Sequence, residues 1–238
     1  MYFKTPLNTN RLLLLLFGAP GTGKGTYGKR LAADYGLAHL STGDLLRGEI
    51  RRESTLGNQI KDAVLTGSNV GDDTICRIVS VELERHCRSV ILDGIPRTAF
   101  QARFVKSVAS SLRLPLVGVD LTLDRSILIQ RLLGRRHCTY CNKDYNTCTI
   151  NIGDYVMDAI LPSKNDILRC PGCSDLKRRK DDTEDVIERR LTIYENDRAE
   201  ILAALKGVPI MTFEVKRGLE EYYKFKDQLE GFVNEHIQ

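Results

Sequence analysis

The sequence has no hydrophobic run long enough to cross a membrane and no low-complexity tract. Its one strongly apolar run, 12–17, is far shorter than the roughly 20 residues that span a bilayer, so we predict that it is a buried strand. With 42% hydrophobic and 28% charged residues, the composition is typical of a folded globular chain and argues against intrinsic disorder. A chain of 238 residues can bury one substantial core.

The sequence also has little excess of charge of either sign. Its 35 Lys and Arg against 31 Asp and Glu leave a formal net charge of +4, too small to indicate nucleic-acid or membrane binding by net charge alone. Residues 1–10 have neither the apolar stretch of a secretory signal nor the Arg-rich pattern of a transit peptide. We therefore expect a cytoplasmic protein, with a mitochondrial or other organellar location left open.

Cysteine is present in an odd number, and four of the seven cysteines form two C-x-x-C pairs. This pattern suits metal binding in a reducing compartment better than a disulfide framework. Two such pairs can present four thiolates tetrahedrally, the closed geometry of structural Zn²⁺. Transient disulfides or unliganded thiols are the alternative. The predicted zinc ligands are Cys138, Cys141, Cys170 and Cys173, and the substitute ligands considered are His137 and Cys148.

Strands and helices alternate along most of the chain, which predicts an α/β fold with a parallel sheet and helices on both faces. Apolar runs mark the strands, and apolar residues at helical spacing mark the helices. We predict strands at 12–17, 89–92, 116–121 and 209–213, and helices at 27–35, 74–86, 100–112, 183–205 and 219–236.

Two segments interrupt this alternation and are predicted to be insertions. Residues 42–70 have helical character but are too polar to cover a sheet, and residues 137–175 contain most of the cysteines without a long helical period. We find no internal repeat. The predicted division is a core of residues 11–41, 71–134 and 182–238, a helical insertion at 42–70, a cysteine-bearing insertion at 135–181, and an N-terminal extension at 1–10.

Glycines crowd the turn after the first predicted strand, in the segment GAPGTGKGT. Glycine lets backbone N–H groups turn inward toward phosphate oxygens, and the following helix adds its positive N-terminal end. Lys24 would place a charge on the transferred phosphate. Phosphate loops usually have Ser or Thr after the Lys, but this chain has Gly25, which weakens the case for direct Mg²⁺ ligation. The candidate phosphate-binding residues are Gly18, Ala19, Pro20, Gly21, Thr22, Gly23, Lys24, Gly25 and Thr26.

Five motifs follow one another in an order that resembles the adenylate kinase family. They are GAPGTGKGT at 18–26, LSTGDLLR at 40–47, LDGIPRT at 92–98, QRLLGRR at 130–136 and RRKDDTEDVIERR at 178–190. The resemblance implies a P-loop NTPase-type sheet, a helical NMP-binding insertion at 42–70 and a zinc-clipped lid at 135–181. It implies reversible, Mg²⁺-dependent phosphoryl transfer from ATP to AMP giving two ADP. GTP as donor, or another nucleoside monophosphate as acceptor, is the alternative.

The resemblance also implies an acceptor site. In the family pattern Thr42 lies near the adenine, Arg47 and Arg97 bind the AMP phosphate, and Gln101 hydrogen-bonds the adenine. Asp93 would hold Mg²⁺ through water. The alternative interpretation is a helix cap followed by a solvated arginine. The predicted AMP-binding residues are Thr42, Arg47, Val70, Gly94, Arg97, Gln101, Arg179 and Arg190.

Phosphoryl transfer needs little covalent chemistry from the protein, because in-line positioning and charge neutralisation supply most of the catalysis. Arginine suits this task through its planar fork of donors, although any single arginine could be a solvated surface charge. By the resemblance, Arg131 and Arg135 also contact ATP, and Asp181 and Asp182 pair with arginines when the lid closes. The predicted catalytic residues are Lys24, Arg97, Arg131, Arg135, Arg179 and Arg190.

Two other classes of protein would have different sequence patterns. A P-loop ATPase or GTPase switch would have Ser or Thr after Lys24 and no need of the acceptor motifs. A nucleic-acid-binding zinc module would have basic and aromatic residues within the knuckles, where this chain has several aspartates, although KRRK at 177–180 favours it. The segment TFEVKRG at 212–218 departs from the family pattern, which leaves ATP against GTP open. We expect nucleotide partners, no nucleic acid, no membrane and a monomer.

Overall fold

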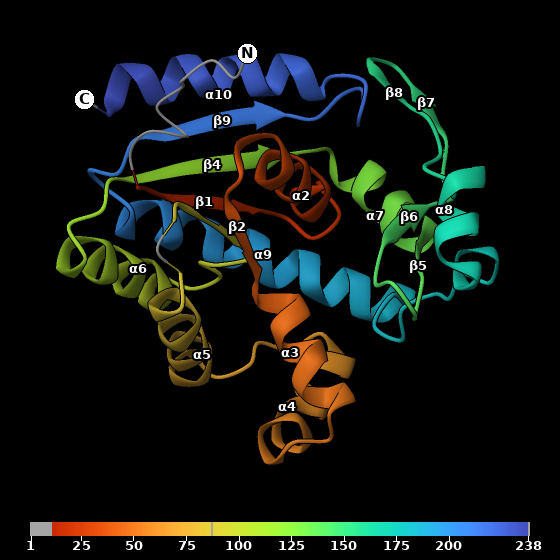
Figure 1. Ribbon diagram of the computed structural model, residues 1–238, viewed down its shortest axis with the longest axis horizontal. Coiled ribbons are helices and arrows are strands. Elements are labelled where there is room, and N and C mark those ends of the chain that lie inside the picture. The colour runs from red at the N-terminus through yellow and green to blue at the C-terminus, as the bar shows by residue number, and fades with distance from the viewer. Residues whose placement is uncertain (1–10, 87, 238) are drawn as a thin grey trace.

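The computed structural model describes residues 11–86 and 88–237, so the predicted extension at 1–10 lies outside the described residues. Five parallel strands form the central sheet in the order β2-β3-β1-β4-β9 (Figure 1). This confirms the predicted α/β class. The strands are β1 (Leu13–Gly18), β2 (Ala38–Ser41), β3 (Val90–Asp93), β4 (Leu116–Thr122) and β9 (Ile210–Glu214).

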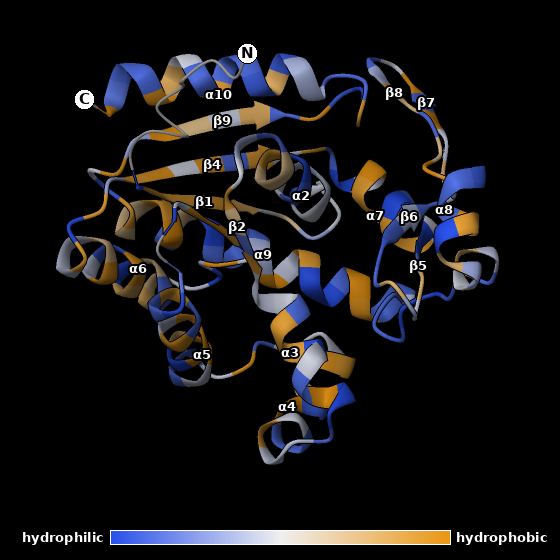
Figure 2. Cartoon of the chain, in the orientation of Figure 1, coloured by the Kyte–Doolittle hydropathy of each residue, from blue (hydrophilic) through white to orange (hydrophobic). Residues whose placement is uncertain are grey.

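The central strand β1 is apolar on both faces because helices cover both sides of the sheet. Alternate residues of a strand point to opposite faces. Leu14 and Leu16 join a core cluster with residues of α2 and α10, whereas Leu13 and Leu15 join a cluster with α5, α6 and α9. Figure 2 shows the resulting concentration of apolar residues on the sheet. The helices are α2 (Lys24–Tyr35), α5 (Asp72–Glu84), α6 (Ala99–Ser111), α9 (Glu184–Ala204) and α10 (Tyr222–His236).

Two helices form the lobe at the bottom of Figure 1, within the predicted insertion at 42–70. Helix α3 begins directly after β2, where the Ser41 side chain accepts a hydrogen bond from the Asp44 amide and caps the helix. Helix α4 packs closely on α3, since a Cβ added to Gly57 would collide with the Glu49 carbonyl group. Their bounds are α3 (Thr42–Arg51) and α4 (Thr55–Thr66).

The segment between β4 and α9 contains short elements only. Helix α7 leads into two antiparallel hairpins, β5 with β6 and β7 with β8, followed by α8 and a 3-10 turn. No helix of the described ranges is long and apolar enough to span a membrane. The bounds are α7 (Arg125–Gly134), β5 (Arg135–His137), β6 (Asp144–Asn146), β7 (Ile150–Ile152), β8 (Tyr155–Met157), α8 (Lys164–Arg169) and the turn Pro171–Ser174.

Candidate active site

The glycine-rich segment forms a loop between the end of β1 and the start of α2. Gly18, Gly21 and Gly23 have φ angles of 135°, 93° and 98°, a region that favours glycine. A Cβ on Gly18 would also collide with the Leu121 carbonyl oxygen of β4. Lys24, the first residue of α2, folds back so that its Nζ donates to the Gly18 carbonyl oxygen at 2.8 Å. The loop is thus wrapped around the lysine head group.

Most of the predicted phosphate-binding residues line one cavity of about 180 Å³ beside this loop. Thr22 does not line it. Its side chain is buried, and its hydroxyl donates to the Ala19 carbonyl oxygen at 3.0 Å, so it stabilises the loop from behind. Ala19 is also buried and packs against α7 and α9. The loop residues that line the cavity are Gly18, Pro20, Gly21, Gly23, Lys24, Gly25 and Thr26.

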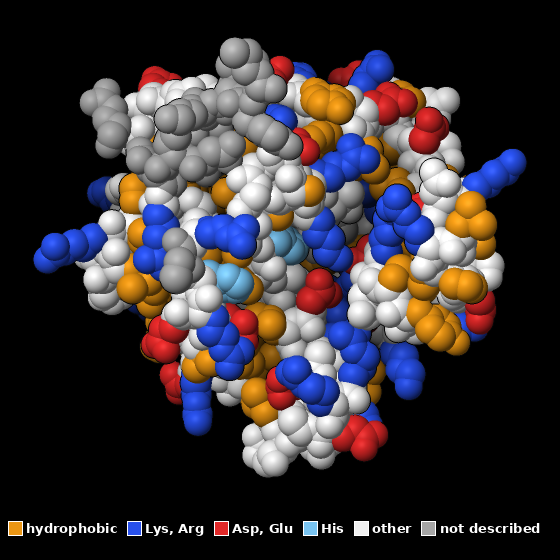
Figure 3. Space-filling model, viewed as in Figure 1, with side chains coloured by type: hydrophobic (Ala, Val, Ile, Leu, Met, Phe, Trp, Pro, Cys, Tyr) orange, Lys and Arg blue, Asp and Glu red, His pale blue; other side chains and the backbone are white. Residues whose placement is uncertain are grey.

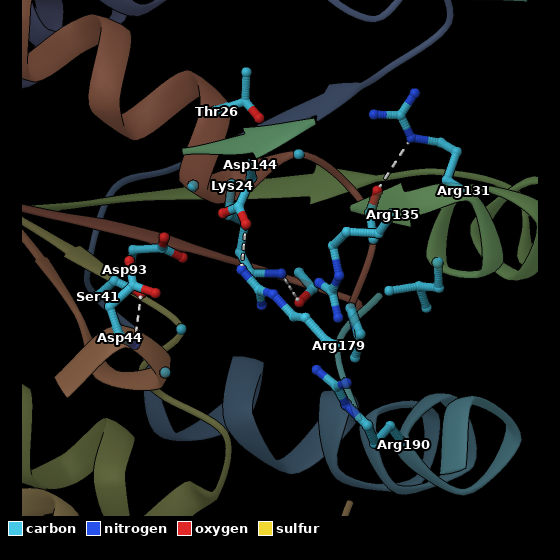
Figure 4. A pocket seen from close by; sticks show the side chains of 18 of the residues that line it. Lys24, Thr26, Ser41, Asp44, Asp93, Arg131, Arg135, Asp144, Arg179 and Arg190 are labelled. Carbon is cyan, nitrogen blue, oxygen red and sulfur yellow. Dashed lines mark hydrogen bonds and ion pairs between the residues drawn. The ribbon is translucent and has the colours of Figure 1, made fainter. Parts of the chain in front are cut away.

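Positive charge converges on the same cavity from distant parts of the sequence. Figure 3 shows Lys and Arg side chains gathered along the central hollow of the molecule, and Figure 4 labels four of the arginines that line it. They come from α3, the loop after β3, α7, β5, the segment that leads into α9, and α9 itself. Six arginines line the cavity together with Lys24: Arg47, Arg97, Arg131, Arg135, Arg179 and Arg190.

This crowding of cations perturbs their protonation. The pKa of Lys24 is lowered to about 8, mainly by burial; the attraction of Asp93 opposes this shift and the nearby arginines contribute to it. Burial and the neighbouring Arg135 lower the pKa of Arg190 to about 10. These lowered pKa values mean that the protein destabilises the charged forms of both side chains relative to the same groups in water. A polyanion entering the cavity would relieve this repulsion, as expected for a phosphate site.

Two arginines of the cavity are held by adjacent aspartates. Arg135 Nε donates to Asp182 Oδ2 at 2.8 Å, and Arg190 Nη1 donates to Asp181 Oδ2 at 2.9 Å. Both aspartates are buried. Asp181 and Asp182 thus pair with arginines, while the predicted dependence of this pairing on lid closure stays a prediction. These ion pairs hold the two guanidinium groups in place beside the cavity.

Arg179 and Arg131 have different surroundings. Arg179 Nη2 donates to Asp144 Oδ1 at 2.7 Å, which joins the segment before α9 to strand β6. Arg131 has no carboxylate within ion-pair distance among the described residues. Its Nε donates to the Gly21 carbonyl oxygen at 3.3 Å, and its Nη1 lies 3.0 Å from Met157 Sδ. Figure 4 places Arg131 at the opposite end of the site from Ser41 and Asp44.

A second cavity of about 50 Å³ adjoins the first. Gln101 in this cavity is 2% exposed, and its Oε1 accepts a hydrogen bond from the Arg97 amide at 2.8 Å. Its Nε2 donates to Asp72 Oδ1 at 2.8 Å. Of the predicted acceptor residues, only Arg179 does not line this cavity. The others are Thr42, Arg47, Val70, Gly94, Arg97, Gln101 and Arg190.

The two phosphate-binding arginines predicted for the acceptor lie at the junction of the cavities. Arg97 Nε donates to the Gly94 carbonyl oxygen at 2.9 Å, and Arg47 Nη2 donates to Asp44 Oδ1 at 2.6 Å. Burial and the nearby Arg47 lower the pKa of Arg97. Thr42 Oγ1 donates to the Gly94 carbonyl oxygen at 3.1 Å, so the same carbonyl orients the hydroxyl and the guanidinium.

Two residues of the site were not found from the sequence. His39 of β2 has its Nε2 3.3 Å from Oδ2 of Asp93, which is buried at the end of β3. Asp72, at the start of α5, holds Gln101. Neither lies in one of the five motifs. The available signal for His39 was its position two residues before Ser41, at the same edge of the sheet as Asp93.

Comparison with known proteins identifies the family. A family model described as adenylate kinase matches residues 16–207. A GTP:AMP phosphotransferase of Plasmodium falciparum (isolate 3D7) is 38% identical over 218 residues, which cover 89% of this chain and 93% of that protein. Adenylate kinase 1, chloroplastic, of Arabidopsis thaliana is 36% identical over 92% of this chain and 70% of its own length. The chain belongs to the adenylate kinase family.

In this member of the adenylate kinase family, the two C-x-x-C pairs come together. All four Sγ atoms lie within 4.8 Å of one another, with 3.7 Å between Cys138 and Cys170 and 3.6 Å between Cys141 and Cys173. A zinc–sulfur bond of about 2.3 Å implies a tetrahedral edge of about 3.8 Å, so the four thiols fit zinc. This confirms the predicted cluster. The two alternative ligands named from the sequence, His137 and Cys148, lie outside this cluster.

The environment of the cluster favours a closed structural site. Cys138 and Cys173 are buried, and the Tyr145 hydroxyl donates to Cys173 Sγ at 3.4 Å. A hydrogen bond to a ligand sulfur orients it from outside the metal's own shell. The cluster joins the turn after β5 to the turn after α8, and none of its four cysteines lines the phosphate cavity. In this adenylate kinase, zinc would therefore stabilise a small subdomain and take no part in the chemistry.

Proposed function

We propose that this chain catalyses the reversible, Mg²⁺-dependent transfer of a phosphoryl group from a nucleoside triphosphate to AMP, with ATP as the first candidate donor. The observation that carries the proposal is that two adjoining cavities share cationic lining residues. The larger cavity holds the phosphate loop, and the smaller one is lined by polar groups suited to a second nucleotide. Two nucleotides bound in this way would meet phosphate to phosphate at the arginines.

The roles of the cations follow from their order along the joined cavities. Arg131 and Arg135 line only the larger cavity, which holds the phosphate loop, and we assign them to the donor. Arg47 and Arg97 line both cavities, and we assign them to the acceptor. Charge spreads over the equatorial oxygens of the transferred group, so cations fixed on both sides would stabilise the transition state. An AMP phosphate oxygen is already an anion near neutral pH, and the reaction therefore needs no general base from the protein.

Mg²⁺ would enter with the nucleotide, and Asp93 is the residue that would hold it through water. Mg²⁺ favours oxygen ligands and usually keeps several waters, which suits a site that offers one buried carboxylate beside the phosphate loop. When bound, the ion would neutralise charge on the donor phosphates. The contact with His39 would keep the Asp93 carboxylate directed toward the cavity.

We also propose that residues 42–70 are the acceptor-binding insertion and residues 135–181 the lid of a core formed by 11–41, 71–134 and 182–238. Two contacts across the cleft support this division. Arg51 Nη1 of α3 donates to Asn142 Oδ1 at 3.1 Å, and Lys29 Nζ lies 3.8 Å from Asp144 Oδ2. A lid in this position would exclude water, the competing phosphate acceptor.

GTP is the second candidate donor, and two observations favour it. The Plasmodium relative is named for GTP and AMP. In this chain Arg131 has no carboxylate partner among the described residues, and an arginine fork matches the O6 and N7 acceptors of guanine.

Steady-state assays test this proposal. ATP and GTP are offered as donors against AMP, UMP and CMP as acceptors, with Mg²⁺ present. We expect diphosphate formation that depends on AMP and that is abolished by Lys24→Ala. A rate with GTP above that with ATP would assign the GTP-using reaction. Hydrolysis of the triphosphate without any acceptor dependence would contradict the proposal.

A further inference from the structure

The β7–β8 hairpin lies within the sequence segment assigned to the lid, yet it packs on the core. Ile150 and Met157 are each 1% exposed and belong to the same apolar cluster as Phe213, Val215 and Phe225. Figure 1 shows the tip of the hairpin beside the loop that follows β9, at the far end of the hairpin from α8. The buried side chains of the hairpin thus belong to the core and not to the zinc subdomain.

Polar contacts fix the hairpin to the strand β9 and the residues that follow it. The Val156 amide donates to the Lys216 carbonyl oxygen at 3.0 Å, and the Tyr155 hydroxyl donates to Glu214 Oε1 at 2.7 Å. Lys216 Nζ lies 3.1 Å from Asp154 Oδ2. A backbone bond, a side-chain bond and an ion pair therefore hold the hairpin in a single orientation on the core.

The buried end of the hairpin reaches Arg131. Met157 Sδ accepts a hydrogen bond from Arg131 Nη1 at 3.0 Å, while Arg131 Nε donates to the Gly21 carbonyl oxygen of the phosphate loop. The guanidinium is therefore oriented from two sides, by the loop and by the hairpin. Gly218 closes a third side, because a Cβ added there would lie 3.6 Å from Met157 Cγ and 3.9 Å from Arg131 Nη1.

The chemistry of this contact suits orientation without neutralisation. A thioether sulfur is a weak, uncharged acceptor. It can set the plane of a guanidinium, but it leaves the positive charge available, whereas a carboxylate would compete with an incoming nucleotide. The cavity arginines Arg135, Arg179 and Arg190 have carboxylate partners. Among the described residues, Arg97 and Arg131 are held by uncharged acceptors instead, and of these two only Arg131 is held by a side chain, that of Met157.

We propose that Met157 is a positioning residue for the donor nucleotide, and that the β7–β8 hairpin is a fixed wall of the donor end of the cleft. The hairpin stays on the core while the zinc-bearing part of the lid moves, and Met157 holds Arg131 in the orientation that receives the donor. The inference rests on the proposed function, since it assigns Arg131 to the donor side. It makes the hairpin a determinant of donor binding and of the choice between GTP and ATP.

The test compares two hairpin variants, Met157→Leu and Ile150→Val. Leucine keeps most of the buried volume at position 157 but has no acceptor sulfur. We expect KM for the donor to rise about three- to tenfold, the cost of one lost hydrogen bond, and the ratio of kcat/KM for GTP to that for ATP to change. KM for AMP should stay within about twofold. Ile150→Val also trims a buried hairpin residue and should leave both KM values unchanged.

The assays distinguish failure of the positioning role from failure of the proposed function. If Met157→Leu matches Ile150→Val in donor KM and in donor preference while the wild type is active, the positioning role is wrong. If the wild type shows no acceptor-dependent transfer, the proposed function fails instead. Hydrogen exchange of the Val156 amide tests whether the β7–β8 hairpin stays on the core. We expect this amide to be protected from exchange both with and without nucleotide. Rapid exchange in the nucleotide-free protein would contradict a fixed hairpin.

Discussion

At the scale of single residues, Lys24 shows how the fold prepares a charge for phosphate. Its pKa of about 8 reflects burial, with the surrounding arginines adding to the effect. The side chain is protonated below this pKa, and only the protonated form can neutralise a phosphate. We therefore expect kcat/KM, which reports the free enzyme, to fall as pH rises through about 8.

The bound enzyme should behave differently. Nucleotide phosphates raise the pKa of a nearby lysine, so kcat should persist to higher pH than kcat/KM. Rate profiles from about pH 6 to about pH 10 measure both quantities. A kcat/KM that stays level to the alkaline end would show that the charge of Lys24 is not required in the free enzyme.

Gln101 gives a prediction about the acceptor. Both ends of its amide are engaged, with the Arg97 amide and with Asp72, so it fixes the wall of the smaller cavity. We expect Gln101→Leu to raise KM for AMP about tenfold or more, because buried polar partners are left unpaired. KM for the donor should change little. Gln59→Leu, at an exposed position on α4, is the matched control.

Glycines and motif residues could be predicted from the sequence, whereas their partners could not. Gly18, Gly21 and Gly23 follow from the backbone that a phosphate loop requires. His39 and Asp72 act by touching Asp93 and Gln101, which belong to other elements. Such contacts depend on how the strands are ordered in the sheet, and local sequence does not specify that order.

At the scale of elements, the sequence predicts strands that are strongly apolar runs, but it does not predict the short strands and helices. The predicted strands at 12–17, 89–92, 116–121 and 209–213 correspond to β1, β3, β4 and β9. Strand β2 was missed because it has four residues, of which only Leu40 is buried. Helix α7 and the two hairpins were missed as well. Their apolar residues meet neighbours from distant segments, and no long period marks them.

The cysteine cluster predicts that the stability of the protein depends on bound zinc. Cys141→Ser removes one thiolate of the four, and the alternative ligands lie outside the cluster. We expect bound zinc to fall well below the roughly one ion per chain that a four-thiolate site holds, with a lower melting temperature. Cys148→Ser is the matched control, since Cys148 lies in the same region but outside the cluster.

Elemental analysis and thermal melting measure both variants under the same conditions. Loss of zinc should also lower kcat, because Arg179, a predicted catalytic residue, is joined to strand β6, and Tyr145 of that strand contacts the cluster. Equal zinc content in Cys141→Ser and Cys148→Ser would contradict the assignment of the four ligands. A melting temperature unchanged by chelation would contradict a stabilising role for the metal.

At the scale of the whole molecule, two projecting parts meet over a basic cavity. The direct contact between Arg51 and Asn142 is exposed, and such hydrogen bonds contribute about 1 kcal/mol or less. Closure should therefore be driven by the nucleotide phosphates and the arginines that they neutralise. The predicted roles of the two insertions require that nucleotide binding, and not the direct contact between them, provides most of the free energy of closure.

Two arginine variants test the balance. Arg135→Ala removes a cavity cation that Asp182 holds in place, and we expect kcat to fall about a hundredfold or more. Arg51→Ala removes only the exposed contact with Asn142 and should change kcat by less than about threefold. Steady-state rates at saturating nucleotide compare them. A larger loss for Arg51→Ala would mean that the contact across the cleft governs closure.

The central claim is that one phosphoryl group passes directly from a triphosphate to AMP within this cleft. The most direct measurement follows a label on the γ-phosphoryl group of the donor, in the presence of AMP and Mg²⁺. The account predicts that the label appears at the β-position of ADP and only when AMP is present. Label that appears as inorganic phosphate, at a rate that AMP does not change, would contradict it.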